Sequence, residues 1–244
     1  MDHSVVRSRL EGLVDDATYL PERALGVLAT IPAIEEQLRG RNSRKRDYSL
    51  RDHTIMVCSL FEKWFSAVPL PLGLRLRALR LMLCLHDIGK PRALAEEQKG
   101  LQHEYTLAVW SDLRDALPIS DREWAICRGL LSDDALGLYV REKISLDESC
   151  DRITTMASVG GRAEPGPFVD LLTIYYQVDA GAYTRAAFLL DPGEFIEKPK
   201  LEAVFLKDAA GDLCFSPQKN RFVFAAPVEE RHRRLRDRLS AGTS

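Results

Sequence analysis

The chain contains few of the features that would mark it as secreted, membrane-spanning or strongly basic. It has five cysteines in 244 residues and no CxxC pair, so a disulfide framework is not expected. It has no run of about 18 uncharged apolar residues and no signal-peptide core near its start, which predicts a soluble cytoplasmic protein with no membrane partner. Its formal net charge is −2, so a polyanionic partner would need a local basic patch.

The hydrophobic pattern predicts an all-α protein with a small C-terminal β-hairpin appendage. Apolar residues recur at spacings of three and four through the first 190 residues, with prolines between the apolar segments, and Ser120 to Glu123 fits a capping box. Helices are expected at roughly 3–15, 21–38, 50–67, 73–88, 102–117, 120–130, 134–144, 147–159 and 167–190.

The pattern changes after residue 191. Phe, Val and Leu alternate with polar residues around the glycine-containing segment 209–212, which predicts a hairpin that packs on the helical body. A short polar helix is expected from Val228. We therefore predict a helical domain over residues 1–190 and an appendage over residues 191–244 that packs on it.

The most informative residues are the adjacent pair His86 and Asp87. They follow the apolar segment that ends at Leu85, and Gly89 and Pro91 come directly after them as signals of a helix end. A buried imidazole or carboxylate is unfavourable unless it is hydrogen-bonded, paired or bound to a cation. A metal ion is the simplest reason for such a pair at the end of an apolar helix.

Three further polar residues lie in helical segments that could supply more ligands. His53 and His103 each lie near the start of a predicted helix, and Asp179 lies in an apolar helix before small residues. Imidazole and carboxylate together suit hydrolytic divalent metals, which lower the pKa of a bound water to about 7. His3 and His232 are expected to face solvent, and the cysteines are expected in the core.

The order of these motifs resembles the HD-domain metal-dependent phosphohydrolase family. The matching segments are R-D-H-T around His53, H-D-I-G-K-P from His86, Q-H-E-Y-T around His103 and V-D-A-G-A-Y around Asp179. The resemblance covers residues 50–188, and it extends to HD domains of RNA-end-processing enzymes and of transfer-RNA nucleotidyltransferases. Members of the family are all-helical and hydrolyse phosphoesters of nucleotides or nucleic acids.

The resemblance implies a role for each matching residue. Lys90 would face the phosphate of the substrate as a catalytic cation, and His103 would ligate a second ion or contact the phosphate. The cofactor would be one or two divalent ions of Mn, Fe, Zn, Ni or Mg. The implied ligands of the first ion are His53, His86, Asp87 and Asp179. Asp87 is also implied to be catalytic.

The sequence departs from the two-metal members of the family at one place. Those members have a further histidine in the next helical region, where this chain reads Ser132-Asp133-Asp134. Asp133 could replace that histidine, because a carboxylate is also a ligand for hard ions. The same three residues could instead cap the following helix, and the site would then hold one metal.

A basic run precedes the first candidate ligand. Arg39, Arg41, Arg44, Lys45, Arg46 and Arg51 carry six positive charges before His53. The run could bind a polyanion, or it could be a solvated loop. Within it, Arg51 is the favoured substrate-binding residue, because it lies two positions from His53.

Two functions are therefore expected, and metal content separates them. The first is a phosphomonoesterase or phosphodiesterase acting on nucleotides or on RNA ends, such as 2′,3′-cyclic or 2′-phosphate termini. The second is a non-catalytic HD module that binds a nucleotide or RNA and regulates a partner. Such a module has no need to keep four ligands.

Overall fold

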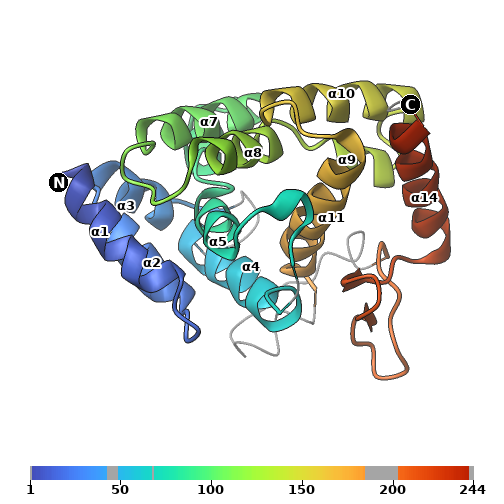
Figure 1. The fold of residues 1–244 in the computed structure, drawn as a ribbon, viewed down its shortest axis with the longest axis horizontal. Helices are drawn as coiled ribbons and strands as arrows, with labels where there is room; N and C mark the ends of the chain where they lie inside the picture. Colours follow the sequence, from blue (N-terminus) through green and yellow to red (C-terminus); the bar gives the residue numbers. More distant parts are fainter. Residues whose placement is uncertain (1, 43–48, 68, 185–202, 242–244) are drawn as a thin grey trace. The chain divides into compact units, whose positions relative to one another are not determined.

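The computed structural model describes residues 2–42, 49–67, 69–184 and 203–241 of the chain. It is mostly helical, with a small two-stranded antiparallel sheet near the C-terminus (Figure 1), which confirms the predicted fold class. In the described ranges, no helix combines the length and the apolar character that crossing a membrane requires. The boundary predicted at residue 190 lies outside the described residues.

Contacts between residues divide the chain into two compact units. Unit 1 comprises Met1–Ser59 and Leu74–Ser132, and unit 2 comprises Leu60–Gly73 and Asp133–Ser244. Unit 1 contains α1 (His3–Val14), α2 (Pro21–Leu28), α3 (Pro32–Arg39), most of α4 (Leu50–Trp64), α5 (Leu76–Leu85), α6 (Lys90–Ala95), η2 (Lys99–Leu101), α7 (Gln102–Asp112) and α8 (Asp121–Leu131). Unit 2 contains the end of α4, η1 (Pro71–Gly73), α9 (Ala135–Val140), α10 (Leu146–Val159), α11 (Pro165–Gly181), β1 (Phe215–Ser216), β2 (Arg221–Phe222) and α14 (Ala226–Ala241).

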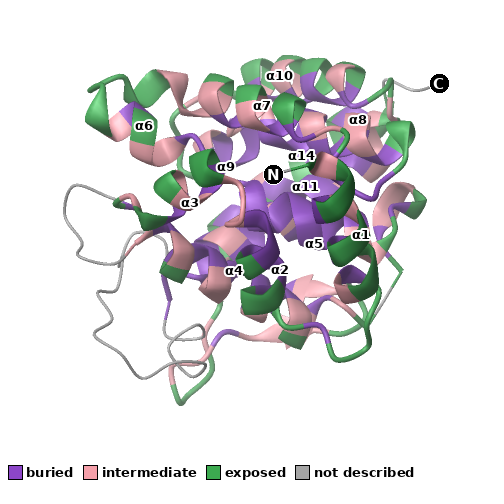
Figure 2. Cartoon of the chain, turned by 90° about the vertical axis from the view of Figure 1, so that its left-hand side faces the viewer, coloured by how far each residue is buried: buried purple, intermediate pink, exposed green. Residues whose placement is uncertain are grey.

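Helix α5 is the core helix of unit 1. Its residues from Ala78 to Leu85 are all buried, and it contacts α1, α2 and α8 (Figure 2). A helix that is apolar on all sides is stable only when neighbours cover it on all sides. Arg80 is also buried, and its guanidinium donates to the carbonyl oxygen of Val14 at 2.7 Å, close to the C-terminal end of α1. The helix therefore delivers its last residues, and the turn that follows them, into the interior of the unit.

The capping box predicted at the start of α8 is confirmed. Ser120 and Glu123 exchange hydrogen bonds between side chain and backbone in both directions. Glu123 also accepts two hydrogen bonds of 2.6 Å from Arg75. Burial alone would raise the pKa of Glu123, but the hydrogen bonds from Arg75 and Ser120 outweigh it and lower the pKa to about 2. This carboxylate therefore ties the start of α5 to the start of α8.

Some helix boundaries in unit 1 differ from the prediction, and two of the differences involve a proline. The segment expected as one helix over residues 21–38 is two helices, because Pro32 begins α3 and has no backbone N–H for a continuing helix. Pro91 was predicted to mark the end of a helix, and α5 does end before it, at Leu85. The helix α6 that follows was not predicted, and Pro91 lies in its first turn, where a missing N–H costs nothing.

The two-stranded sheet of unit 2 packs on α11, but its turn is not the one that was predicted. β1 pairs with β2 around residues 217–220. The predicted turn at residues 209–212 is flanked by an isolated bridge between Lys207 and Leu213, and a second bridge joins Phe205 to Phe224. Gln177 of α11 is fully buried, and its side chain both donates to and accepts from the backbone of Phe222 at 2.8 Å. A buried amide that is satisfied in this way fixes the hairpin on the helix.

His232 does not face solvent, so that prediction was wrong. It lies on α14, only 2% exposed, and its Nε2 is 2.8 Å from Oγ1 of Thr173 on α11. Burial lowers the pKa of His232 to about 3, so the ring is neutral at pH 7. The helix is also longer than the short segment expected from Val228, because Val228, His232, Leu235 and Leu239 form a buried stripe with helical spacing.

Candidate metal centre

His86 and Asp87 form the turn that follows α5, and both are buried. His86 is 3% exposed and Asp87 is 7% exposed. The apolar helix before them fixes their position, and the turn frees their side chains from helical packing. Nδ1 of His86 lies 2.7 Å from the carbonyl oxygen of Leu83. Since a carbonyl can only accept, Nδ1 carries the proton and the lone pair is on Nε2.

His53 of α4 lies opposite this turn. Its side chain is fully buried, and its Nε2 is 3.4 Å from Nε2 of His86. Oδ2 of Asp87 is 3.6 Å from Nε2 of His53 and 3.7 Å from Nε2 of His86. Two imidazole nitrogens and one carboxylate oxygen therefore form a small triangle in the interior of unit 1.

Asp179 of α11 completes a group of four side chains that can hold a metal ion. His53, His86, Asp87 and Asp179 each offer one ligand atom, and these atoms all lie within 4.8 Å of one another. The first three are buried and Asp179 is partly exposed. These are the four residues that the sequence motifs marked as ligands of the first ion, and ligation itself stays a prediction.

The donor set fits a divalent ion. Ligand atoms at about 2.1 Å from a common ion are about 3.4 Å apart at a tetrahedral angle and farther apart at wider angles. The three distances of 3.4, 3.6 and 3.7 Å in unit 1 agree with this spacing. Two neutral imidazoles and two carboxylates suit Mn²⁺, Zn²⁺ or Fe²⁺, and such a set leaves coordination positions for water or substrate.

Two further side chains bind the carboxylate of Asp87. Nζ of Lys90 donates to Oδ2 at 2.6 Å, and Nε2 of Gln102 donates to Oδ1 at 2.7 Å. Lys90 is the residue predicted to act as a cation beside the substrate, and its ammonium lies next to the candidate ligands. Gln102 was missed in the sequence, where its only signal was its position directly before His103.

His103 lies in the first turn of α7 with a fixed ring orientation. Its Nδ1 is 3.0 Å from the carbonyl oxygen of Leu131, so Nδ1 donates and the lone pair is on Nε2. This hydrogen bond fixes the ring with Nε2 as the atom that could meet an ion or a phosphate. Both predicted roles of His103, ligation of a second ion and contact with the phosphate, stay predictions.

The other two predicted site residues have partners in their own units. Asp133 accepts two hydrogen bonds from the guanidinium of Arg152 of α10, and the one from Nε is 2.7 Å long. An Arg-carboxylate pair of this kind competes with metal ligation, and the ligand role of Asp133 stays a prediction. Arg51 of α4 donates to Glu35 of α3 at 3.0 Å, and its role in substrate binding also stays a prediction.

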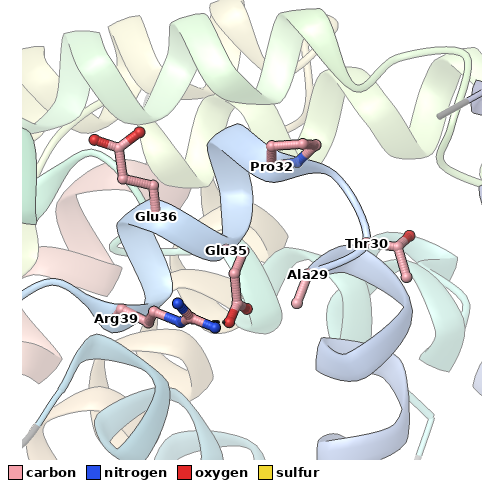
Figure 3. Close-up of a pocket in the computed structure, with 6 residues that line it drawn as sticks. All are labelled: Ala29, Thr30, Pro32, Glu35, Glu36 and Arg39. Carbon is pink, nitrogen blue, oxygen red and sulfur yellow. Dashed lines mark hydrogen bonds and ion pairs between the residues drawn. The ribbon is translucent and has the colours of Figure 1, made fainter.

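A separate pocket lies between the end of α2 and α3. Its lining includes Glu35 and Arg39, which form an ion pair of 2.6 Å (Figure 3). The pocket contains none of the predicted metal ligands. Of the basic run, Arg44, Lys45 and Arg46 lie outside the described residues. The full lining is Ala29, Thr30, Pro32, Glu35, Glu36 and Arg39.

Comparison with protein-family models, curated proteins and solved structures found no match to this chain. The interpretation of the site therefore rests on its geometry, its chemistry and the motif resemblance.

Proposed function

We propose that the chain is a metal-dependent phosphohydrolase that acts on nucleotides or on RNA ends, such as 2′,3′-cyclic or 2′-phosphate termini. The observation that carries the proposal is the group His53, His86, Asp87 and Asp179, whose ligand atoms lie within 4.8 Å of one another. Burial of histidines and carboxylates is unfavourable unless hydrogen bonds, ion pairs or a cation compensate it, and a divalent ion would satisfy all four side chains together. The motif resemblance supplies the substrate class.

The chain's own residues would divide the work of such a reaction. The chemistry that a divalent ion supplies when bound is a lowered pKa for water and neutralisation of charge on phosphoryl oxygens. His86 presents the lone pair of Nε2 from a buried ring that Leu83 orients, and the buried ring of His53 would supply its own Nε2, 3.4 Å away, as a second ligand. Asp87 and Asp179 supply negative charge that a divalent cation requires.

Lys90 would stabilise the negative charge that develops on the phosphoryl group. Lys90 lies in the first turn of α6, its side chain is 17% exposed, and its ammonium is 2.6 Å from Oδ2 of Asp87. A cation fixed in a partly desolvated site contributes more than one in bulk water, because the local dielectric is lower. His103, with its lone pair on Nε2, would contact the phosphate or hold a second ion, as the motif resemblance implies.

The test is an activity screen with metal-loaded protein. Purified protein is loaded with Mn²⁺ and assayed on nucleoside monophosphates, cyclic nucleotides, and RNA with 2′,3′-cyclic or 2′-phosphate ends. We expect turnover of at least one class, and loss of both turnover and bound Mn²⁺ in Asp87→Ala. Asp112→Ala is the matched control, because Asp112 is an exposed carboxylate at the end of α7, and it should keep both.

The outcomes separate the two functions expected from the sequence. Bound metal with no turnover on any substrate would favour the non-catalytic module that binds a nucleotide or RNA. Absence of bound metal in the wild-type protein would contradict the metal centre itself. Full activity in Asp87→Ala would refute the assignment of the site.

A further inference from the structure

We infer that Gln102 is a positioning residue of the metal centre, which holds Asp87 so that one defined carboxylate oxygen faces the two histidines. The inference rests on the proposed function and deepens it, because it gives a role to a residue to which the motif resemblance assigned none. It starts from the hydrogen bond of 2.7 Å between Nε2 of Gln102 and Oδ1 of Asp87.

The two oxygens of Asp87 have different surroundings. Oδ1 accepts from the neutral amide of Gln102, and Oδ2 accepts from the ammonium of Lys90. Oδ2 is also the oxygen that lies 3.6 and 3.7 Å from the histidine nitrogens. A carboxylate can only accept, so the amide nitrogen of Gln102 must face it. Rotation of the carboxylate would break the Gln102 bond, which therefore keeps Oδ2 directed toward His53 and His86.

Gln102 is itself held in place by close packing between α7 and the turn after Asp87. A Cβ atom on Gly89 would lie 2.7 Å from the carbonyl oxygen of Gln102 and 2.4 Å from the backbone nitrogen of Thr106. The backbone N–H of Gly89 donates to Oγ1 of Thr106 at 3.1 Å. The first turn of α7 therefore lies directly against the His-Asp turn, so the side chain of Gln102 has only a short distance to span to the carboxylate of Asp87.

The position of Gln102 predicts a specific effect on metal binding. Residues that orient a metal ligand from outside the coordination shell change affinity by about 10–100-fold when removed. Gln102 is partly exposed, so its loss leaves no cavity in the core and the fold should stay intact. A purely structural residue would show the opposite pattern, with a lower melting temperature and unchanged metal affinity.

The experiment compares Mn²⁺ binding in the wild-type protein and in Gln102→Leu. Isothermal titration gives the dissociation constant, the electron paramagnetic resonance spectrum of bound Mn²⁺ reports the geometry of the site, and the melting temperature without metal reports the fold. We expect a dissociation constant for Mn²⁺ that is raised about 10–100-fold, an altered spectrum and an unchanged melting temperature. Should Gln102→Leu fail to fold, Gln102→Met gives the same test, because its thioether cannot donate.

Gln98→Leu is the matched control. Gln98 is an exposed residue just before η2, and its Oε1 accepts from the hydroxyl of Tyr105 rather than binding Asp87. Its loss should leave Mn²⁺ affinity and spectrum unchanged. Unchanged Mn²⁺ affinity in Gln102→Leu, with a wild-type protein that binds Mn²⁺, would overturn this inference alone. A wild-type protein that binds no Mn²⁺ would overturn the proposed function and this inference together.

Discussion

Substitution of Gly89 by alanine should damage both the fold of unit 1 and the metal centre. The backbone of Gly89 has φ −82° and ψ −8°, which any residue can adopt, so the effect is purely steric. The added Cβ would lie 2.4 Å from the nitrogen of Thr106, 2.7 Å from the carbonyl oxygen of Gln102 and 2.7 Å from the carbonyl carbon of Tyr105. All three atoms belong to the backbone of α7, so no side chain can move aside to make room.

The magnitude follows from the displacement that the clash requires. Relief of the shortest contact to ordinary van der Waals distance needs a shift of α7 by about 1 Å, and overpacking of this kind costs about 1–3 kcal/mol. The hydrogen bond from Gly89 to Thr106 would weaken as well, which adds about 1 kcal/mol. We expect the free energy of unfolding to fall by about 2–4 kcal/mol, and Mn²⁺ affinity to fall because Gln102 moves with α7.

Urea denaturation followed by circular dichroism measures the first effect, and Mn²⁺ titration measures the second. Gly26→Ala is the control, because a Cβ on Gly26 of α2 meets nothing within 4 Å. It should raise stability by about 0.5–1 kcal/mol, the usual gain from alanine in a helix. If Gly89→Ala unfolds within about 0.5 kcal/mol of the wild type, the close approach of α7 to the His-Asp turn is wrong.

Three further predictions concern charge and pH. Because burial lowers the pKa of His232 to about 3 from 6.5, the folded protein stays neutral there while the unfolded chain binds a proton. The free energy of unfolding should therefore fall by about 1.4 kcal/mol for each pH unit below 6.5. Urea denaturation at pH 7 and pH 5 should show a smaller fall in His232→Gln than in the wild type. An equal fall in the two proteins would contradict the prediction. The pKa of Glu123 is lowered from 4.5 to about 2, so its contribution is present above pH 4.5 and lost as pH falls toward 2. With Arg75 half exposed, Glu123→Gln should cost about 1–2 kcal/mol at pH 7, and an unchanged urea midpoint would argue against it. Lys90→Met should tighten Mn²⁺ binding about tenfold, because the charge-assisted hydrogen bond from Lys90 no longer competes with the ion for Asp87. Turnover of the phosphoester should fall about 100-fold or more. Weaker Mn²⁺ binding in calorimetry would exclude competition between Lys90 and the ion.

Much of the helical architecture could be predicted from local sequence signals. The apolar segment before His86 predicted a buried helix, and Ser120 with Glu123 predicted the start of α8, because both signals act within a few residues. Two prolines that begin helices were not recognised as such: Pro32 was placed inside one long helix, and Pro91 was interpreted as the end of a helix. Proline is compatible with the first turn of a helix as well as with its end, and the sequence alone does not say which applies.

Features that depend on contacts between distant segments could not be predicted in the same way. His232 lies in a segment rich in charge, and tertiary contacts with Thr173 of α11 and with the ring of Phe224 bury it. Gln102 binds Asp87 because α7 packs against Gly89, and the sequence shows only that the residues are 15 positions apart. His53, His86, Asp87 and Asp179 were marked by motif resemblance, which carries information about contacts that composition and periodicity do not contain.

The most direct test of the metal centre is a crystal of protein grown with Mn²⁺, with diffraction data collected on both sides of the manganese absorption edge. The proposal predicts one anomalous peak bonded to Nε2 of His53, Nε2 of His86 and carboxylate oxygens of Asp87 and Asp179. A map with no peak at these four side chains, or with the side chains directed to separate regions, would contradict it.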